Sequence, residues 1–284
     1  MNIEKLSLSH QTILQDKLKK SGSLLSEYSF ANLYLFRGFH DYEVLTEDEN
    51  IFIAGKTYDG KKFIMPAEGA NARNFRPLLK ALGERDFIFP IAEEMLGNFD
   101  PELFEIKYSE NDSDYVYLTE RLATYKGQKL HSKKNLLNQF LSLYSPMAKP
   151  LTKDLMDDAR NILDEWQLDM NEPKTDTDYY PALEAFKLYD ELVLCGGIYY
   201  VENEPAGFII GEEIGEKAFA LHFAKGKRKF KGMYQYMFNH FAGILPKKYE
   251  LLNFEQDMGK LALKIAKSSY HPDMVLKKYR VCPK

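Results

Sequence analysis

Residues 218–245 decide how the fold is interpreted, and they read AFALHFAKGKRKFKGMYQYMFNHFAGIL. The first six residues, 218–223, are apolar except for one histidine, so they predict a strand. From residue 230 onward, large apolar side chains recur at steps of three and one, which is the spacing of one helix face. These side chains are Phe230, Met233, Tyr234, Met237, Phe238 and Phe241. The stretch therefore predicts a strand, a short loop and a helix over 230–245.

The loop between that strand and that helix is strongly basic. Five of the eight residues at 225–232 are Lys or Arg, and two are Gly. Glycine permits a close backbone approach, and the first turn of a helix presents free N–H groups and a partial positive charge. We therefore expect a phosphate or pyrophosphate group to bind there. The expected contacts are Lys225, Gly226, Lys227, Arg228, Lys229 and Gly232. The alternative is a solvated loop whose lysines serve solubility.

The same order of elements is expected twice along the chain: three strands, a loop, a helix, a strand, a helix and a strand. In the first half, we expect strands at 42–45, 51–54, 62–65, 87–89 and 104–108, and helices at 71–82 and 92–96. In the second half, we expect strands at 193–201, 206–212, 218–223, 251–254 and from 274, and helices at 230–245 and from 258. Residues 111–114, Asn-Asp-Ser-Asp, form a polar break. Two domains are therefore predicted, 1–112 and 113–284, the second with an additional strand at 115–118 and extra helices.

A second basic run, 126–135, precedes or begins a helix. It reads KGQKLHSKKN. Bases at the start of a helix oppose the helix dipole, so a bound anion would relieve an electrostatic cost. We expect substrate contacts from Lys129, His131, Lys133, Lys134 and Asn135. The alternative is an ordinary solvated surface run.

Candidate proton acceptors lie in and after residues 253–259, which read NFEQDMG at a strand-to-helix junction. Glu255 or Asp257 could take a proton from an attacking amine or orient that amine, and the alternative for Asp257 is to cap the helix that follows. His271 is a third candidate base, and its alternative is a bond to the carbonyls that end the last helix. Asn253 and Tyr270 are expected to contact substrate.

The composition excludes several classes of protein. Of 284 residues, 45% are hydrophobic and 28% are charged, which excludes a disordered chain. A net charge of −4 argues against a surface that binds nucleic acid all over, so any anion site must be local. Two cysteines exclude a disulfide framework and a multi-cysteine zinc site, and no metal site is predicted. No apolar run approaches the roughly 18 residues of a membrane span. The N-terminus lacks the apolar region of a secretory signal, so we expect a cytoplasmic protein.

Several stretches together resemble a known family. They are Phe30–Leu33, 115–118 with 126–135, 196–201, and 253–259 with 269–272. As a set they are similar to soluble bacterial relatives of the C-terminal domain of phosphatidylglycerol lysyltransferase, many of which have no assigned function. The strand, basic loop and helix of 218–245 resemble the donor-binding half of a GNAT-type acyltransferase. The resemblance implies an α/β (α+β) fold of two tandem GNAT-like (acyl-CoA N-acyltransferase) domains, each a mixed central sheet flanked by helices. Fem-type aminoacyl transferases share that arrangement, and here the first domain is expected to lack a donor site.

The resemblance also implies an acyl- or aminoacyl-transferase. In the lysyltransferase the donor is lysyl-tRNA and the acceptor is a lipid head group. For this chain we expect no tightly bound cofactor, a coenzyme A thioester or an aminoacyl-tRNA as donor, and an amine or hydroxyl as acceptor. The acyl carbonyl is expected at the splayed ends of the strands at 218 and 251, where a strand N–H polarises it. Two other functions stay open: a ligand-binding protein that keeps the fold without catalysis, and a nucleic-acid binder, which the net charge disfavours.

Overall fold

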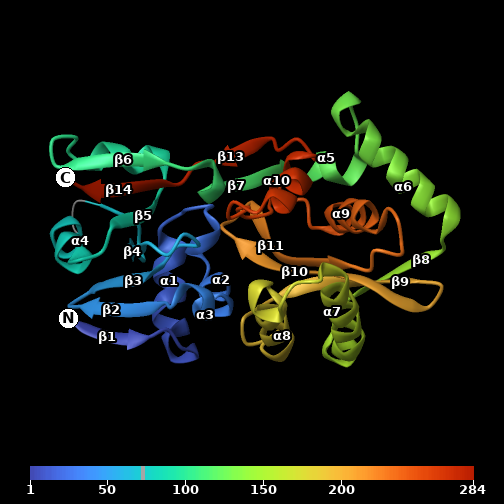
Figure 1. The fold of residues 1–284 in the computed structure, drawn as a ribbon, viewed down its shortest axis with the longest axis horizontal. Helices are drawn as coiled ribbons and strands as arrows, with labels where there is room; N and C mark the ends of the chain where they lie inside the picture. Colours follow the sequence, from blue (N-terminus) through green and yellow to red (C-terminus); the bar gives the residue numbers. More distant parts are fainter. Residues whose placement is uncertain (72–73) are drawn as a thin grey trace. The chain divides into compact units, whose positions relative to one another are not determined.

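The computed structural model of the protein describes residues 1–71 and 74–284, and the chain forms two compact units (Figure 1). Unit 1 comprises Met1–Tyr115, Glu255–Lys264 and Val275–Lys284, and unit 2 comprises Val116–Phe254 and Ile265–Met274. The expected boundary after residue 112 lies close to the observed division after Tyr115. The expected assignment of all of 113–284 to one domain differs from the structure, because two late segments pack with unit 1 instead.

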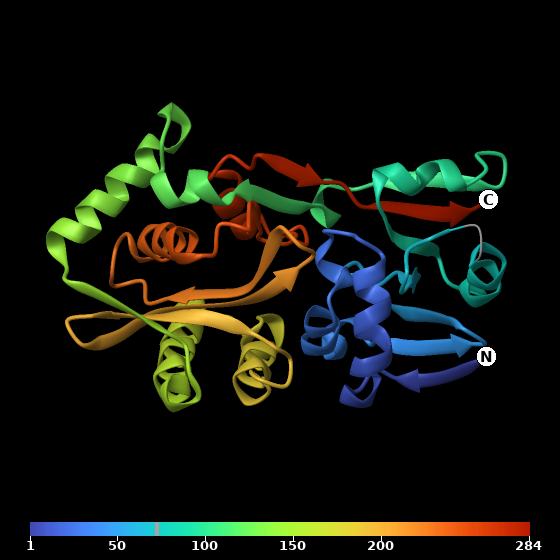
Figure 2. The same ribbon diagram turned by 180° about the vertical axis from the view of Figure 1, so that it is seen from behind.

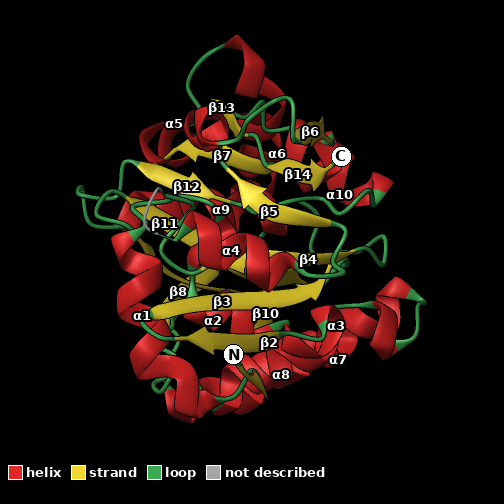
Figure 3. Cartoon of the chain, turned by 90° about the vertical axis from the view of Figure 1, so that its left-hand side faces the viewer, coloured by secondary structure: helices red, strands yellow, loops and turns green. Residues whose placement is uncertain are grey.

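The sheet of unit 1 has seven strands in the order β1-β2-β3-β4-β5-β14-β6 (Figure 3). The strands are β1 (Asn2–Lys5), β2 (Glu43–Glu47), β3 (Asn50–Lys56), β4 (Lys62–Pro66), β5 (Phe87–Ile91), β6 (Phe104–Tyr108) and β14 (Tyr279–Pro283). Its α-helices are α1 (Gln11–Lys20), α2 (Phe30–Leu35), α3 (Arg37–His40) and α4 (Phe75–Leu82). Its 3-10 turns are η1 (Leu8–His10), η2 (Ser26–Tyr28), η3 (Glu93–Asn98) and η4 (Glu110–Asp112). Neighbouring strands are antiparallel except β4 and β5, which run parallel.

The second sheet also has seven strands, in the order β13-β7-β12-β11-β10-β9-β8. These are β7 (Asp114–Leu118), β8 (Pro146–Pro150), β9 (Cys195–Val201), β10 (Glu204–Ile214), β11 (Ala218–Gly226), β12 (Leu251–Asn253) and β13 (Met274–Leu276). The helices are α5 (Thr119–Thr124), α6 (His131–Leu143), α7 (Met156–Met170), α8 (Tyr179–Lys187), α9 (Met233–Ile244) and α10 (Leu261–Ser268), with 3-10 turns η5 (Gln128–Leu130), η6 (Lys153–Leu155) and η7 (Lys174–Asp176). Helices α7 and α8 cover one face of this sheet and α9 covers the other (Figure 2).

The predicted repetition of elements is confirmed. The first half gives β2, β3, β4, α4, β5, η3 and β6, and the second gives β9, β10, β11, α9, β12, α10 and β13. In each sheet, the second strand of the parallel pair also pairs with a strand from a distant part of the chain. These pairs are β5 with β14 and β12 with β7. Two mixed sheets flanked by helices are therefore the architecture, as expected.

Some predicted bounds differ from the structure. Helix α9 begins at Met233 because 230–232 form a turn, and Gly232 before it has a φ of 95°. The expected helix at 71–82 is observed as α4, from Phe75, and positions 72 and 73 of that expectation lie outside the described residues. The helix expected at 92–96 is the 3-10 turn η3. Helix α10 carries the predicted apolar stripe, but Leu261 and Ile265 on it are 70% and 61% exposed.

Candidate functional site

Strand β12 is shorter than its neighbour β11. Their parallel pairing covers three residue pairs, from Ala218 with Leu251 to Ala220 with Asn253, where β12 ends. Among the described strands, only β10 lies alongside β11 from there to Gly226. Backbone N–H groups on such an unpaired edge can polarise a carbonyl that lies beside it. The position of an acyl carbonyl at splayed strand ends stays a prediction.

The basic loop after β11 has internal partners for two of its lysines. Lys225 is buried, with Nζ 2.7 Å from both carboxylate oxygens of Asp178 and 3.7 Å from the centre of the Trp166 ring. Lys227, 2% exposed, contacts the carboxylates of Glu165 at 2.7 Å and Glu204 at 2.9 Å. A buried ammonium group requires such compensation. These two lysines therefore bind carboxylates of the protein where a ligand phosphate was expected.

Two backbone amides of that loop also have hydrogen-bond partners within the protein. The amide of Lys227 donates to the Ala206 carbonyl at 2.9 Å, and the amide of Gly226 donates to the Tyr234 hydroxyl at 3.2 Å. Lys229 contacts Glu204 and, with Lys227, lowers the pKa of that carboxyl. Arg228 is exposed. Phosphate binding by Arg228, Lys229 and Gly232 stays a prediction.

The second basic run lines a hollow of about 550 Å³ in unit 2. Its walls are Tyr125, Lys126, Gly127, Gln128, His131 and Lys134. Helix α6 begins here without a side-chain cap and without an acidic residue in its first turn. Within the described ranges, no carboxylate pairs with Lys126, Lys129 or Lys134. An uncapped helix start with unneutralised bases attracts an anion.

Lys133, which belongs to this basic run, lies against Tyr270. Both residues are predicted to contact substrate. The Lys133 ammonium group is 2.6 Å from the Ser269 hydroxyl and 4.1 Å from the centre of the Tyr270 ring. Burial lowers the pKa of Lys133. The Tyr270 hydroxyl accepts a hydrogen bond from Gln235 at 3.0 Å. On helix α6, His131 Nδ1 lies 3.3 Å from Asn135 Nδ2.

Glu255 follows the end of β12 by two residues. Its φ of 61° is in the left-handed region, which is unfavourable for a residue with a Cβ and is often found at functional positions. The side chain is half-buried, and its Oε1 accepts a hydrogen bond from Asn32 Nδ2 at 2.8 Å. Asn253, by contrast, is buried within β12. The role of Glu255 as a proton acceptor stays a prediction.

The other two predicted bases have structural roles. Asp257 is fully buried, where it accepts hydrogen bonds from the Tyr115 hydroxyl at 2.6 Å and the Gly259 amide at 2.8 Å. It thus caps the turn before α10, close to the alternative role expected for it. His271 is exposed, and its main-chain amide donates to the Ser268 carbonyl at 2.9 Å. The end of α10 is closed by the backbone of His271, not by its ring.

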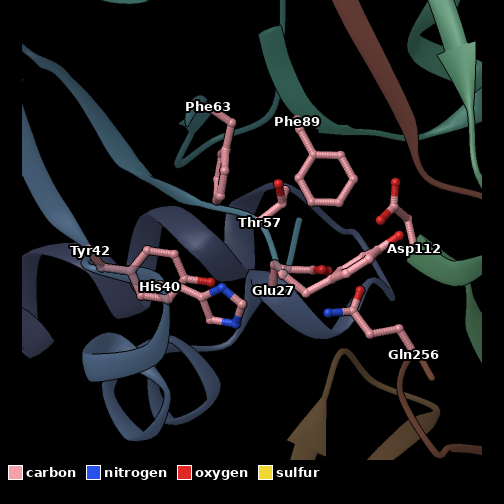
Figure 4. Close-up of a pocket in the computed structure, with 9 residues that line it drawn as sticks. Glu27, His40, Tyr42, Thr57, Phe63, Phe89, Asp112 and Gln256 are labelled. Carbon is pink, nitrogen blue, oxygen red and sulfur yellow. The ribbon is translucent and has the colours of Figure 1, made fainter. Parts of the chain in front are cut away.

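Sequence reasoning missed a buried charge cluster in unit 1. Lys278 contacts Glu27 at 2.7 Å and Asp114 at 2.6 Å, and all three side chains are 6% exposed or less. The amide of Ser26 donates to Asp114 at 2.8 Å. A cavity of about 10 Å³ adjoins Glu27, and Figure 4 shows Tyr42, His40 and Gln256 around it. The sequence offers no clear signal for it, because Lys278 stands in the basic stretch Lys277-Lys278-Tyr279-Arg280 and Glu27 stands between Ser26 and Tyr28.

Glu27 gives unit 1 a specific pH dependence. Burial raises the pKa of the Glu27 carboxyl to about 7 against the opposing charge of Lys278, and Asp114 adds to the rise. The folded protein thus holds this proton more tightly than the unfolded chain does, so the resulting stability is present below about pH 4.5 and is lost as the pH rises through 7.

Replacing Glu27 with Gln is expected to remove the loss of stability that occurs as the pH rises through 7. The free energy of unfolding of Glu27→Gln, measured relative to the wild type in urea, is expected to be higher at pH 8 than at pH 5 by about 2–3 kcal/mol. Glu94→Gln is the control, since Glu94 is exposed. Equal differences at the two pH values would contradict the role of Glu27.

Comparisons with known proteins agree with this architecture. Residues 19–282 match the family model described as phosphatidylglycerol lysyltransferase, C-terminal. The uncharacterised protein MYCGA3080 of Mycoplasmoides gallisepticum is 25% identical over 178 residues, which are 61% of this chain and 56% of that protein. The chain thus spans about half the length of the curated relative that it matches.

Three solved structures share the fold. A conserved protein of unknown function from Bacteroides thetaiotaomicron VPI-5482 has a TM-score of 0.88 and 26% identity, with all of both chains covered. L-PGS from Bacillus licheniformis has a TM-score of 0.62 and 13% identity, covering 95% of this chain and 91% of that one. FemX has a TM-score of 0.57 and 8% identity, covering 99% of this chain and 97% of that one.

The architecture of two mixed sheets flanked by helices is as predicted, and L-PGS and FemX share this fold. In the described parts of the chain, 1–71 and 74–284, no helix has both the length and the apolar character that crossing a bilayer requires. The family model extends over most of the sequence, including every strand of the second sheet and the segment with Glu255. By that match, the chain belongs to the family of the phosphatidylglycerol lysyltransferase C-terminal domain.

Proposed function

We propose that the protein is an aminoacyltransferase that moves an aminoacyl group from tRNA to an acceptor, with Glu255 as the proton acceptor. The half-buried Glu255 carboxylate, which accepts a hydrogen bond from Asn32 and stands on a left-handed backbone residue, is the observation that carries this proposal. A carboxylate held in this way can take the proton that an attacking amine or hydroxyl loses. Family membership supports a transferase in general.

The charges of unit 2 favour tRNA over coenzyme A as the donor. A coenzyme A pyrophosphate would use the loop after β11, and Lys225 and Lys227 there bind Asp178, Glu165 and Glu204 instead. The hollow at the start of α6 keeps its bases unneutralised and is large enough for a nucleotide phosphate and its sugar. A nucleic acid binds chiefly through such phosphate contacts.

The chemistry needs few specialised groups. The acceptor attacks the ester carbonyl, a new bond to the acyl carbon forms, and Glu255 takes the proton that the acceptor loses. The tetrahedral intermediate then expels the 3′ oxygen of the tRNA, which receives that proton from Glu255. Positioning of donor and acceptor supplies much of the remaining rate.

The test is a transfer assay with the full chain. The donors are tRNA charged with radiolabelled lysine, since the family name specifies that group, tRNA charged with other amino acids, and labelled acetyl-coenzyme A. The acceptors are phosphatidylglycerol vesicles, glycinamide and glycolamide. Label moving from a charged tRNA faster than with heat-inactivated protein supports the proposal. Transfer only from acetyl-coenzyme A, or binding of tRNA without any transfer, overturns it, and the latter result would identify a binding protein that keeps the fold.

Removing lysines from the hollow is expected to weaken tRNA binding. It should also make that binding less sensitive to salt concentration. The double variant Lys126→Ala, Lys134→Ala loses two phosphate contacts, so the slope of log K against log salt should fall by about 1–2. Fluorescence anisotropy of labelled tRNA from 50 to 200 mM salt, roughly the range in which such contacts weaken, measures this slope. Lys187→Ala, an exposed lysine on α8, is the control and should leave the slope unchanged. An unchanged slope in the double variant would remove the hollow from the donor site.

A further inference from the structure

Helix α2 is a rigid support for one side chain, Asn32. All six residues of α2 are buried, and the Ser29 hydroxyl caps the helix by accepting a hydrogen bond from the Asn32 amide at 3.0 Å. The Asn32 carbonyl accepts from Phe36 at 3.1 Å. A polar side chain on such a support has few conformations available, so its direction is determined by the fold.

The two polar groups of the Asn32 side chain differ: the NH₂ group donates a hydrogen bond, and the carbonyl oxygen can still accept one. Nδ2 donates to Glu255 Oε1 at 2.8 Å, and Asn32 as a whole is 8% exposed. Across residues 1–71 and 74–284, no donor contacts Asn32 Oδ1, although the atom is not fully sealed from solvent. Burying a carbonyl oxygen costs free energy unless a hydrogen-bond donor replaces the water that it loses.

We propose that Asn32 and Glu255 together form the acceptor subsite, and that this subsite is built for a primary amine. The inference rests on the proposed function. A neutral primary amine carries two N–H hydrogens, so it donates one to Asn32 Oδ1 while Glu255 takes the other as the bond from nitrogen to the acyl carbon forms. The ester C–O bond then breaks, and the leaving oxygen receives the proton from Glu255. A hydroxyl has a single hydrogen, which Glu255 needs, so Asn32 Oδ1 stays without a donor.

This difference predicts selectivity. A site that hydrogen-bonds one substrate group rejects an analogue lacking it, because a buried polar atom is then left unpaired. Glycinamide and glycolamide form a matched pair, since they differ only in the amine and the hydroxyl. The wild type is expected to transfer to glycinamide with a kcat/KM at least about 100-fold higher than to glycolamide.

The variant that tests the pair is Asn32→Ala. Loss of Nδ2 removes one hydrogen bond from the Glu255 carboxylate, and loss of Oδ1 removes the amine contact, so kcat/KM for glycinamide should fall on the order of 100-fold. The ratio of amine to hydroxyl transfer should fall about tenfold. Asn138→Ala is the control: Asn138 is exposed on α6, so its loss should leave the ratio as in the wild type. Equal ratios in Asn32→Ala and the wild type overturn the proposal.

A second measurement does not depend on activity. The side-chain amide resonances of Asn32, observed by ¹⁵N NMR, are expected to differ between the wild type and Glu255→Gln, because Nδ2 then donates to an amide oxygen in place of a carboxylate. Identical Asn32 side-chain resonances in the two proteins overturn the pairing. If the wild type transfers to no acceptor, the proposed function fails by itself, and this comparison still decides whether the pair exists. If Asn32→Ala does not fold, Asn32→Leu replaces it, because it keeps the branched shape and loses both polar atoms.

Discussion

Replacing Lys278 with Met is expected to lower the free energy of unfolding of unit 1 by about 3–5 kcal/mol. Lys278 is the cation between the two carboxylates of Glu27 and Asp114, and its side chain is 0% exposed. Methionine has nearly the same length and fills the space, so the loss is electrostatic and not a cavity effect. At pH 8, above the pKa of about 7 that Glu27 has in the wild type, the change leaves two buried carboxyl groups without a counter-ion. Urea unfolding, followed by hydrogen exchange of peptides from β4 and β5, measures the effect on unit 1.

The neighbouring residue is the control for that change. Lys277 is exposed and lies 3.4 Å from the exposed Glu93. Such a surface pair contributes little, so Lys277→Met is expected to change the free energy of unfolding by less than about 1 kcal/mol. The double variant Lys278→Met, Glu27→Gln should recover part of the loss, because one buried charge is then removed together with its partner. A similar small effect at both lysines would refute the cluster as a major source of stability.

Glu255→Gln is expected to reduce aminoacyl transfer by a factor of about 10²–10⁴, the usual contribution of a positioned acid or base. Glutamine keeps an acceptor for Asn32 Nδ2 and can occupy the same half-buried position, so the melting temperature should change little. The transfer rate with charged tRNA, measured together with tRNA binding, separates a chemical defect from a binding defect. Binding should equal that of the wild type.

Glu216→Gln serves as the matched control for this substitution. Glu216 is exposed in the turn before β11, so its replacement should leave both transfer and binding unchanged. Full transfer activity in Glu255→Gln would assign the proton to another group. It would also remove the main reason for interpreting the strained backbone at residue 255 as functional.

The fold follows largely from local patterns in the sequence. The apolar stripe of 230–241 and the turn signals between short strands locate α9 and both three-stranded meanders, because periodicity reports directly on which face is buried. Strand pairing between distant segments has no such local signal. The insertion of β14 beside β5 therefore could not be inferred from residues 279–283. The same limit applies to α10, where the pattern indicates a helix but not which face is covered.

The candidate site was only partly predictable. The sequence locates Glu255 at the end of a strand, and the structure adds the left-handed backbone and the bond from Asn32. The loop at 225–232 shows why composition alone misleads. Its charge is visible in the sequence, but the carboxylates that neutralise Lys225 and Lys227 come from α7, α8 and β10, many residues away. Asp257 and Glu255 look alike in sequence, but Asp257 is buried and bonded to Tyr115 and Gly259, whereas Glu255 is half-buried and bonded to Asn32.

The position of β14 has a consequence for synthesis of the protein. Residues 1–112 contain β1 to β6, yet the strand that lies between β5 and β6 is not made until residues 279–283. Until then one edge of β5 is unpaired and β6 lacks the strand with which it pairs. Such edges are the surfaces on which aggregation begins and to which chaperones bind. Completion of the N-terminal unit is thus one of the last events in the maturation of this chain.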